Sequence, residues 1–293
     1  MSQEQIRQII EARVDQDGLT ETRVPGVKLF RATEPLPCAP AVYEPCIVAI
    51  VSGSKEAVLD GQRYVYDSAQ YLCCPTSLPV KAGTPAASSD NPLFGVFVTL
   101  DQRIMGELAM DMENAGASFG PDPSGQSARG IKLAQWDEAF ADTLLRLVQA
   151  SEAEVEAAVL GPLRLREFYY AVLRGEAGQF ARHAFGAGNA IARSIAHVAA
   201  HLEAPISIDE MADRAGMSRA VFHRKFKQVT TMSPIQFVKS MRLGNAAMRI
   251  AGGVAVSEAA LDVGYASASQ FSREFKRMYG QSPRQWSDAQ GAA

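Results

Sequence analysis

The chain contains 293 residues and carries a formal net charge of −3 at pH 7. This length allows two domains, each with its own hydrophobic core. No apolar run approaches the roughly 20 residues that a membrane-spanning helix requires, and the polar N-terminal segment lacks the apolar stretch of a signal peptide. These features argue against a membrane protein. We expect a cytoplasmic protein whose four cysteines are free thiols rather than a disulfide framework.

The net charge conceals opposite balances in the two parts of the chain. Residues 190–293 contain 13 Lys and Arg against 8 Asp and Glu, a net charge of +5. Residues 1–189 contain 16 against 24, a net charge of −8. A basic surface attracts polyanions and an acidic one repels them. Nucleic acid is therefore expected to bind the C-terminal part only.

Residues 25–100 alternate short apolar runs with turn residues, which predicts strands. Within this region Asp60-Gly61 is a typical two-residue hairpin turn. Seven strands at this spacing favour a small barrel or sandwich. The predicted strands cover residues 27–32, 46–52, 56–60, 63–66, 71–74, 78–81 and 93–100.

From residue 101 onward the apolar spacing becomes helical, which predicts helices over 101–114, 136–151 and 162–174. Residues 119–130 are rich in Gly, Pro and Ser and are predicted to form an exposed loop. These helices are expected to hold a homodimer, with plain packing inside the domain as the alternative. The candidate contacts are Leu144, Leu145, Leu147, Val148, Leu163, Leu165 and Phe168.

The N-terminal part offers two kinds of effector site. Cys46, Cys73 and Cys74 lie on predicted strands, and Cys38 lies in a Pro-rich turn. An accessible thiolate could capture an electrophile, whereas a buried cysteine packs as a small hydrophobe. The other possibility is a reversible pocket for an apolar or aromatic ligand. Its candidate lining is Phe30, Tyr43, Tyr64, Tyr66 and Tyr71, which could equally form ordinary core.

The C-terminal part repeats one module. The segments 208–237 and 256–286 align with an offset of 48 residues before a central glycine turn and 49 after it. A repeat that occurs twice is two copies of a module rather than a solenoid. Each copy contains a helix, a glycine turn and a second helix that carries Arg and Lys. The matched pairs are Ala212 with Ala260, Gly216 with Gly264, Phe222 with Phe271, Arg224 with Arg273, Phe226 with Phe275, Lys227 with Lys276, and Ser233-Pro234 with Ser282-Pro283.

Helix-capping signals mark the boundaries of each copy. Ser207 with Glu210, and Ser267 with Gln270, have the spacing of a capping box, and Ser218 stands where it could cap the second helix of the first copy. Each Ser-Pro pair supplies a cap residue and a proline at the first helical position. The inward spacing of the Phe residues leaves a polar face outward. That face is formed by Arg219, Ala220, His223, Arg224 and Lys227 in the first copy and by Ser269, Gln270, Ser272, Arg273 and Lys276 in the second.

Such a face suits the major groove of double-stranded DNA. An α-helix fits this groove, and Arg can pair with two acceptors of guanine. Lys side chains beside it suit phosphates, which position a protein without reading sequence. A solvated helical hairpin is the alternative for one copy, but two copies with matched Arg, Lys and Ser-Pro positions favour DNA recognition. The predicted helix-turn-helix units cover about residues 207–229 and 256–279.

Residues 190–288 resemble the DNA-binding domain of the AraC/XylS family of bacterial transcription regulators. The resemblance is strongest in the stretch GYASASQFSREFKRMYGQSPRQW, and a long helix from Pro234 to Ile250 would join the two units. It implies that Arg224 and Arg273 contact bases, with Ala220, His223, Ser269 and Ser272 at neighbouring recognition positions. It also implies that the protein acts on a promoter, as an activator, together with RNA polymerase.

Residues 18–175 resemble the N-terminal domain of one AraC-type subgroup, through GLTETRVPGVKLFRA and YEPCIVAIVSGSKEAVLDGQRYVYDSAQYLCC. This resemblance implies a cupin-like barrel followed by helices used for dimerisation. Regulators of aldehyde detoxification belong to that subgroup, which implies a small-molecule or electrophile effector. The expected class is α+β, with an effector and dimerisation domain over residues 1–175, a linker over 176–189 and a DNA-binding domain over 190–293.

A cupin-type enzyme fused to a DNA-binding domain is the alternative function. Metal-dependent cupins hold their metal largely through histidine, and none of the four histidines precedes His183. We therefore expect no catalytic residue, no metal and no cofactor. His197 and His201 have the i,i+4 spacing that can hold a metal on one helix face, but no third ligand is evident. An exposed helix face is the simpler interpretation.

Overall fold

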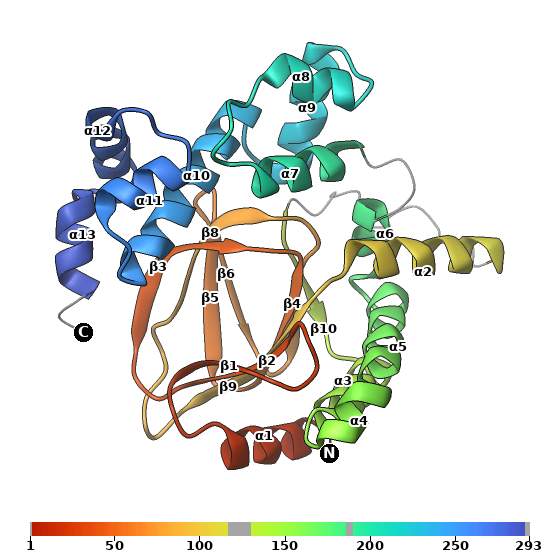
Figure 1. Ribbon diagram of the computed structural model, residues 1–293. Helices are drawn as coiled ribbons and strands as arrows, with labels where there is room; N and C mark the ends of the chain where they lie inside the picture. Colours follow the sequence, from red (N-terminus) through yellow and green to blue (C-terminus); the bar gives the residue numbers. More distant parts are fainter. Residues whose placement is uncertain (1, 117–129, 186–189, 291–293) are drawn as a thin grey trace. The chain divides into compact units, whose positions relative to one another are not determined.

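The computed structural model describes residues 2–116, 130–185 and 190–290 (Figure 1). The described residues form two compact units, one of residues 2–38, 44–76, 82–116 and 130–185 and the other of 39–43, 77–81 and 190–290. Residues 178–185 of the expected linker form helix α6 (Gly178–Phe185), because Ala181 packs into the core of the first unit. Residues 186–189 of that linker and residues 119–129 of the predicted loop lie outside the described residues.

The β-structure consists of two sheets. The larger has the strand order β1-β2-β9-β4-β7-β10 and the smaller has the order β3-β8-β5-β6. The predicted α+β class is confirmed, and the strands form two sheets that do not close into one barrel. The strands are β1 (Gly18–Glu21), β2 (Val27–Ala32), β3 (Leu36–Tyr43), β4 (Cys46–Ser52), β5 (Ser54–Leu59), β6 (Gln62–Asp67), β7 (Gln70–Cys74), β8 (Leu78–Thr84), β9 (Leu93–Thr99) and β10 (Lys132–Gln135).

All seven predicted strands are present, with bounds shifted by at most a few residues. β4 reads as an unbroken apolar run because it lies inside the larger sheet, between β9 and β7, where both faces are covered. The turn at Asp60-Gly61 is confirmed. Both residues adopt positive φ, 48° and 81°, and Leu59 pairs with Gln62 on either side of them.

The sequence did not predict three of the strands, β1, β3 and β10, and each of them lies at the edge of a sheet. β3 contains Pro37 and Pro40, which is why the sequence read as a turn around Cys38. That interpretation is wrong, because an edge strand has one row of backbone N–H groups without a ladder partner and so tolerates proline.

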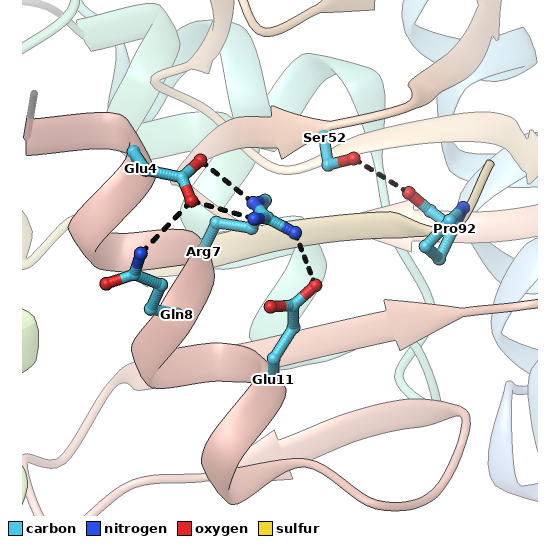
Figure 2. Close-up of polar contacts among 6 residues, drawn as sticks. All are labelled: Glu4, Arg7, Gln8, Glu11, Ser52 and Pro92. Carbon is cyan, nitrogen blue, oxygen red and sulfur yellow. Dashed lines mark hydrogen bonds and ion pairs between the residues drawn. The ribbon is translucent and has the colours of Figure 1, made fainter.

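Helix α1 (Ser2–Arg13) covers one side of the β-structure with an amphipathic surface. Ile6 and Ile10 are fully buried. On the opposite face Arg7 donates to Glu4 and to Glu11, spacings at which helical side chains meet (Figure 2). The same view shows the Ser52 hydroxyl donating to the carbonyl of Pro92 at 3.0 Å, a contact at the end of β4.

The remaining helices of this unit share its main core. That core joins the outer face of the larger sheet to helices that include α3 and α5, and Tyr71 of β7 stacks on Phe140 of α3 with ring centroids 4.0 Å apart. The predicted helices over 101–114, 136–151 and 162–174 are confirmed. The helices are α2 (Gln102–Asn114), α3 (Glu138–Ala150), α4 (Glu154–Val159) and α5 (Gly161–Arg174), besides α1 and α6.

The second unit carries the repeated modules on a series of helices (Figure 1). These are α7 (Ala190–Ala200), α8 (Ile208–Arg214), α9 (Arg219–Thr230), α10 (Pro234–Ala251), α11 (Val256–Asp262), α12 (Ala268–Tyr279) and α13 (Pro283–Gln290). The predicted long joining helix is α10. Within the described ranges of the chain, no helix has the length and apolarity to cross a bilayer.

Candidate nucleic-acid interface

The first module consists of α8, a turn and α9. The Ser207 hydroxyl accepts from the backbone N–H of Glu210 at 3.4 Å, and Gly216 turns the chain with φ of +65°. The return bond of the expected capping box is not formed. Ser218 makes no side-chain cap bond, so its predicted capping role is wrong. Phe222 and Phe226 are fully buried and hold α9 in place.

The second module repeats this arrangement with α11 and α12. The Ser267 hydroxyl accepts from the backbone N–H of Gln270 at 3.2 Å, but Gln270 directs its amide to Glu274 rather than back to the cap. Gly264 has φ of +84°. Phe271 and Phe275 are fully buried, as are their counterparts in the first module. The two copies therefore hold α9 and α12 in place by the same means, a pair of fully buried phenylalanines.

The Ser-Pro pairs begin the helix that follows each module. Ser233 and Gln236 form a capping box at the start of α10. At α13 the Ser282 hydroxyl accepts from the backbone N–H of Gln285 at 3.2 Å while the Gln285 side chain accepts from the N–H of Ser282 at 2.8 Å. Each box satisfies N–H groups that a helix start otherwise leaves unpaired. The predicted cap function of both serines is confirmed.

The predicted outward faces of α9 and α12 are largely exposed. On α9, His223 is half-buried and Arg219 forms an exposed ion pair with Asp209 at 3.2 Å. Arg224 and Arg273 make no hydrogen bond or ion pair with any described residue. The exposed residues are Arg219, Ala220, Arg224 and Lys227 on α9 and Ser269, Gln270, Arg273 and Lys276 on α12, while Ser272 is half-buried.

A polar network that the sequence did not reveal anchors α12. Glu274 lies 3.1 Å from Lys239 of α10 and accepts from the hydroxyl of Tyr265 at 2.8 Å. Partial burial alone would raise the pKa of Glu274, but hydrogen bonds from Tyr265, Lys239 and Gln270 hold it below its ordinary value. Two features of the sequence could have indicated this network. Tyr265 directly follows the turn glycine Gly264, and Glu274 is the one carboxylate on the otherwise basic α12.

In the β-rich unit, Cys46 and Cys74 are direct partners across β4 and β7. Their side chains and that of Cys73 have no exposed surface. Cys73 points to the opposite face and packs in the core beneath the helices, as strand alternation predicts. Burial raises the pKa of Cys46 and of Cys73. These thiols are poor nucleophiles in the folded chain, because the thiolate is the reactive form.

Cys38 differs from the other three cysteines. It is partly exposed, and its sulfur lies 3.8 Å from a carboxylate oxygen of Glu56. Burial and the negative charge of Glu56 raise the pKa of Cys38. Arg63 does not offset this effect fully, because its guanidinium is paired with the same Glu56 carboxylate.

Lys55 of β5 is the unexpected polar group of this unit. It is half-buried, and its ammonium lies 5.6 Å from the ring centroid of Phe30. Burial lowers the pKa of Lys55, while the nearby Cys38 and Cys46 act in the opposite direction. Lys55 forms no hydrogen bond and no ion pair with any described residue. Nothing in the sequence distinguishes Lys55 from an ordinary strand lysine, which usually faces solvent.

The expected aromatic lining is divided between two environments. Phe30 covers Gly95, whose lack of a side chain leaves room for the ring. Tyr71 belongs instead to the core against Phe140, so it does not share a site with Phe30. Tyr66 is buried and Tyr64 is half-buried.

Histidines and carboxylates do not assemble a metal centre in the part of the chain that the structure describes. No group of three or more His, Cys, Asp or Glu side chains is placed to hold an ion. His197 and His201 do lie together, with ring centroids 4.5 Å apart. Arg214 contacts His197, and partial burial followed by the Arg214 charge lowers the pKa of His197. A guanidinium beside the ring would oppose a metal cation.

Comparison with known proteins places this architecture in a family. Residues 23–180 match the family model for the AraC-type transcriptional regulator N-terminus, and residues 211–289 match that for a helix-turn-helix domain. The first match covers more than half of the chain. The chain belongs to the AraC-type transcriptional regulators. The helix-turn-helix match covers both modules apart from the first residues of α8.

The relatives agree with this assignment. Over 81 residues the chain is 41% identical to the HTH-type transcriptional regulator MtrA of Neisseria gonorrhoeae, a match that spans 27% of this chain and 27% of MtrA. Over 90 residues it is 31% identical to the regulatory protein SoxS of Escherichia coli K12, which spans 30% of this chain and 84% of SoxS. The chain therefore spans about a quarter of MtrA and most of SoxS.

Solved structures of ToxT from Vibrio cholerae share the fold of nearly the whole chain. An apo ToxT variant has a TM-score of 0.60 at 12% identity, covering 93% of this chain and 98% of ToxT. Wild-type ToxT bound to an unsaturated fatty acid has a TM-score of 0.55 at 12% identity, covering 89% and 94%. This likeness shows a shared arrangement of strands and helices.

Proposed function

We propose that α9 and α12 are the two recognition helices of a sequence-specific transcriptional regulator and that they enter successive major grooves of double-stranded DNA. The observation that carries this proposal is the pair Arg224 and Arg273. They occupy matched positions in the two modules, are exposed, and have no protein partner among the described residues. Arg with free donors suits guanine, and two major-groove contacts would lie about 34 Å apart along B-DNA.

The neighbouring residues divide into two roles. Lys227 and Lys276 are exposed near the ends of α9 and α12 and would contact phosphates. Arg219 would first have to leave Asp209, an exposed pair of low stability that a phosphate could replace. The residues left for base edges are Ala220, His223, Ser269, Gln270 and Ser272. By family resemblance, the regulator would activate transcription in the cytoplasm by contact with RNA polymerase.

A homodimer is part of the proposal, with its contacts revised. Four of the residues expected at a dimer contact are fully buried inside the first unit: Leu144, Leu147, Val148 and Phe168. Leu163 remains 63% exposed, close in sequence to the exposed Val155 and Val159 of α4. A second copy would therefore contact the α4–α5 surface around Leu163 rather than the buried leucines.

For the effector, we propose a small carboxylate with an apolar body whose carboxylate pairs with Lys55. An ammonium that is half-buried without a counter-ion is unfavourable, and an anionic ligand would relieve that cost. The unsaturated fatty acid bound to ToxT has this chemistry. A reactive aldehyde that modifies a cysteine is the alternative. The burial of Cys46, Cys73 and Cys74 opposes it, and Cys38 is the thiol within reach.

The DNA proposal is tested with duplexes that the full-length protein selects from a random-sequence library. Arg273→Ala should weaken binding to the selected site by about 1–3 kcal/mol and relax one base position. Lys276→Ala should weaken all duplexes similarly and reduce the slope of affinity against salt by about one. Unchanged affinity of Arg273→Ala would show that α12 does not read bases as proposed.

The effector proposal is tested by titrating the full-length protein with oleate and, separately, with glyoxal. Lys55→Met should weaken oleate binding about tenfold or more, whereas Lys28→Met should not, because Lys28 is a strand lysine already paired with Glu21 at 2.6 Å. Equal oleate binding by both variants would contradict the carboxylate site. A glyoxal adduct in the intact mass that disappears in Cys38→Ser would instead support the electrophile.

A further inference from the structure

The turn of the second module contacts the chain segment that leads into the first module. A Cβ atom built on Gly264 would lie 2.8 Å from the carbonyl oxygens of both Leu202 and Glu203. These carbonyls belong to the turn that follows α7, on the chain leading into the first module. Real Cβ atoms do not approach backbone oxygens so closely. Glycine at 264 therefore permits the second module to contact the segment that leads into the first, besides supplying the positive φ of its own turn.

Arg242 of α10 holds that contact together. Its Nε donates to the carbonyl of Leu202 at 2.9 Å and its Nη2 donates to the carbonyl of Ala204 at 2.8 Å. The same Nη2 would lie 3.1 Å from a Cβ on Gly264. A planar guanidinium suits such a two-point contact because its donors are fixed relative to one another. The two bonds also give hydrogen-bond partners to two backbone carbonyls of the turn that follows α7.

The second module is tied to the same helix one turn away. Lys239 precedes Arg242 by three residues, a spacing that puts both side chains on one side of α10. Lys239 pairs with Glu274 of α12 at 3.1 Å, and both side chains are mostly buried, with 26% and 20% exposed. One side of α10 thus fixes the turn that leads into the first module and the recognition helix of the second.

Base reading depends on where α9 and α12 lie relative to each other. The contacts of α10 therefore affect which distance between DNA half-sites the protein accepts. We propose that Arg242 is a positioning residue that sets the spacing of half-sites the protein accepts, by holding the 202–204 turn against Gly264. The inference rests on the proposed reading of two successive grooves. With Arg242 in place the two helices are held at one separation and rotation. Without it each module keeps its own aromatic core, and the angle between them loosens.

The experiment measures affinity against spacer length. Full-length protein selects a duplex from a random-sequence library, and one to five base pairs are then inserted between its two half-sites. Two inserted base pairs rotate one half-site by about 70° relative to the other. Wild-type protein should lose about tenfold or more in affinity on this insertion, while Arg242→Met should lose about threefold or less. Affinity for duplexes with one half-site scrambled should be equal in the two proteins.

Two further variants serve as a control and as an intermediate for Arg242→Met. Arg249→Met removes an arginine from the same helix whose partner, Asp262 at 2.5 Å, lies within the second module. It should keep the wild-type spacing profile, because it links no module to the other. Arg242→Lys can make one of the two carbonyl bonds at a time and should give an intermediate profile. It also provides the measurement if Arg242→Met does not fold.

The outcomes separate this inference from the function on which it rests. If wild-type protein selects no duplex, or selects one with a single half-site, the two-groove proposal is wrong. If wild-type protein shows a sharp spacing profile and the folded Arg242 variants show the same profile, Arg242 does not set the spacing. A flattened profile in Arg242→Met alone supports the inference.

Discussion

The two helix-turn-helix modules have the same sequence pattern and the same aromatic core, yet they are held differently. A Cβ added to the turn glycine of the first, Gly216, would meet no neighbouring atom within 4 Å, whereas one added to that of the second, Gly264, would meet two backbone carbonyls. The recognition helix of the second is tied to α10 through Glu274, and the matched position of the first is the exposed Lys225. A repeat thus preserves the local fold of a module while its neighbours decide how tightly it is held.

The largest expected difference in stability between the modules is at the two turn glycines. Gly216→Ala should lower the free energy of unfolding by about 1 kcal/mol through left-handed backbone strain alone. Gly264→Ala should lower it by about 3 kcal/mol or more, because the carbonyls of Leu202 and Glu203 must also move. Urea unfolding followed by Trp286 fluorescence, in a Trp136→Phe background, reports on the second module. Equal losses at the two positions would contradict the close contact of Gly264 with the carbonyls of Leu202 and Glu203.

A smaller difference is expected at the matched positions 274 and 225. Glu274→Gln removes the charge that pairs with Lys239 and should destabilise the second module by about 1 kcal/mol. Lys225→Gln removes an exposed side chain and should change stability by less than about 0.5 kcal/mol. The same fluorescence transition measures the first change, and circular dichroism of the helical transition measures both.

The pKa of Glu274 makes the two modules respond differently to acid. Because this pKa is held below its ordinary value of 4.5, the stabilisation is present above pH 4.5 and is lost as pH falls through the lowered pKa. Amide hydrogen exchange should therefore show α12 losing protection at low pH before α9 does. In Glu274→Gln this difference between the helices should disappear. Its persistence would assign the effect to another group.

The smallest effect is expected where each recognition helix ends. The cap residue that follows α12 is Gly280, with φ of 79°. The cap residue that follows α9 is Thr231, a β-branched residue in a left-handed conformation with φ of 69°. The Thr231 hydroxyl is also buried without a hydrogen-bond partner among the described residues. Thr231→Gly should stabilise the helical unit by about 0.5–1 kcal/mol. Thermal unfolding that shows a loss of stability would indicate that Thr231 has another role.

Sequence patterns were most informative where structure is local. The two modules followed from periodicity and glycine turns, and the seven predicted strands from short apolar runs. Strand β3 was missed because Pro37 and Pro40 usually exclude strand structure, and only its place at a sheet edge allows them. Ser218 looked like a helix cap but makes no cap bond, since spacing alone does not orient a hydroxyl.

The candidate sites show the same division. The exposed faces of α9 and α12 were predictable because helical spacing decides which residues oppose a buried Phe stripe. By contrast, the position of Lys55 near Phe30, without an ion-pair partner among the described residues, depends on which strands of the two sheets face each other. Cys46 likewise has no exposed surface because β4 lies inside its sheet. This burial, which the sequence does not show, makes Cys46 a packed thiol rather than a reactive one.

By itself the sequence determined that the chain carries two helix-turn-helix modules, a basic C-terminal part and a β-rich N-terminal part. These properties depend on residue type, charge and spacing along the chain. Only the tertiary structure decided that Arg242 joins Leu202 and Ala204 beside Gly264 and that Glu274 joins α12 to α10. Such contacts bring together residues about 35 to 60 positions apart, and no local periodicity encodes their distance.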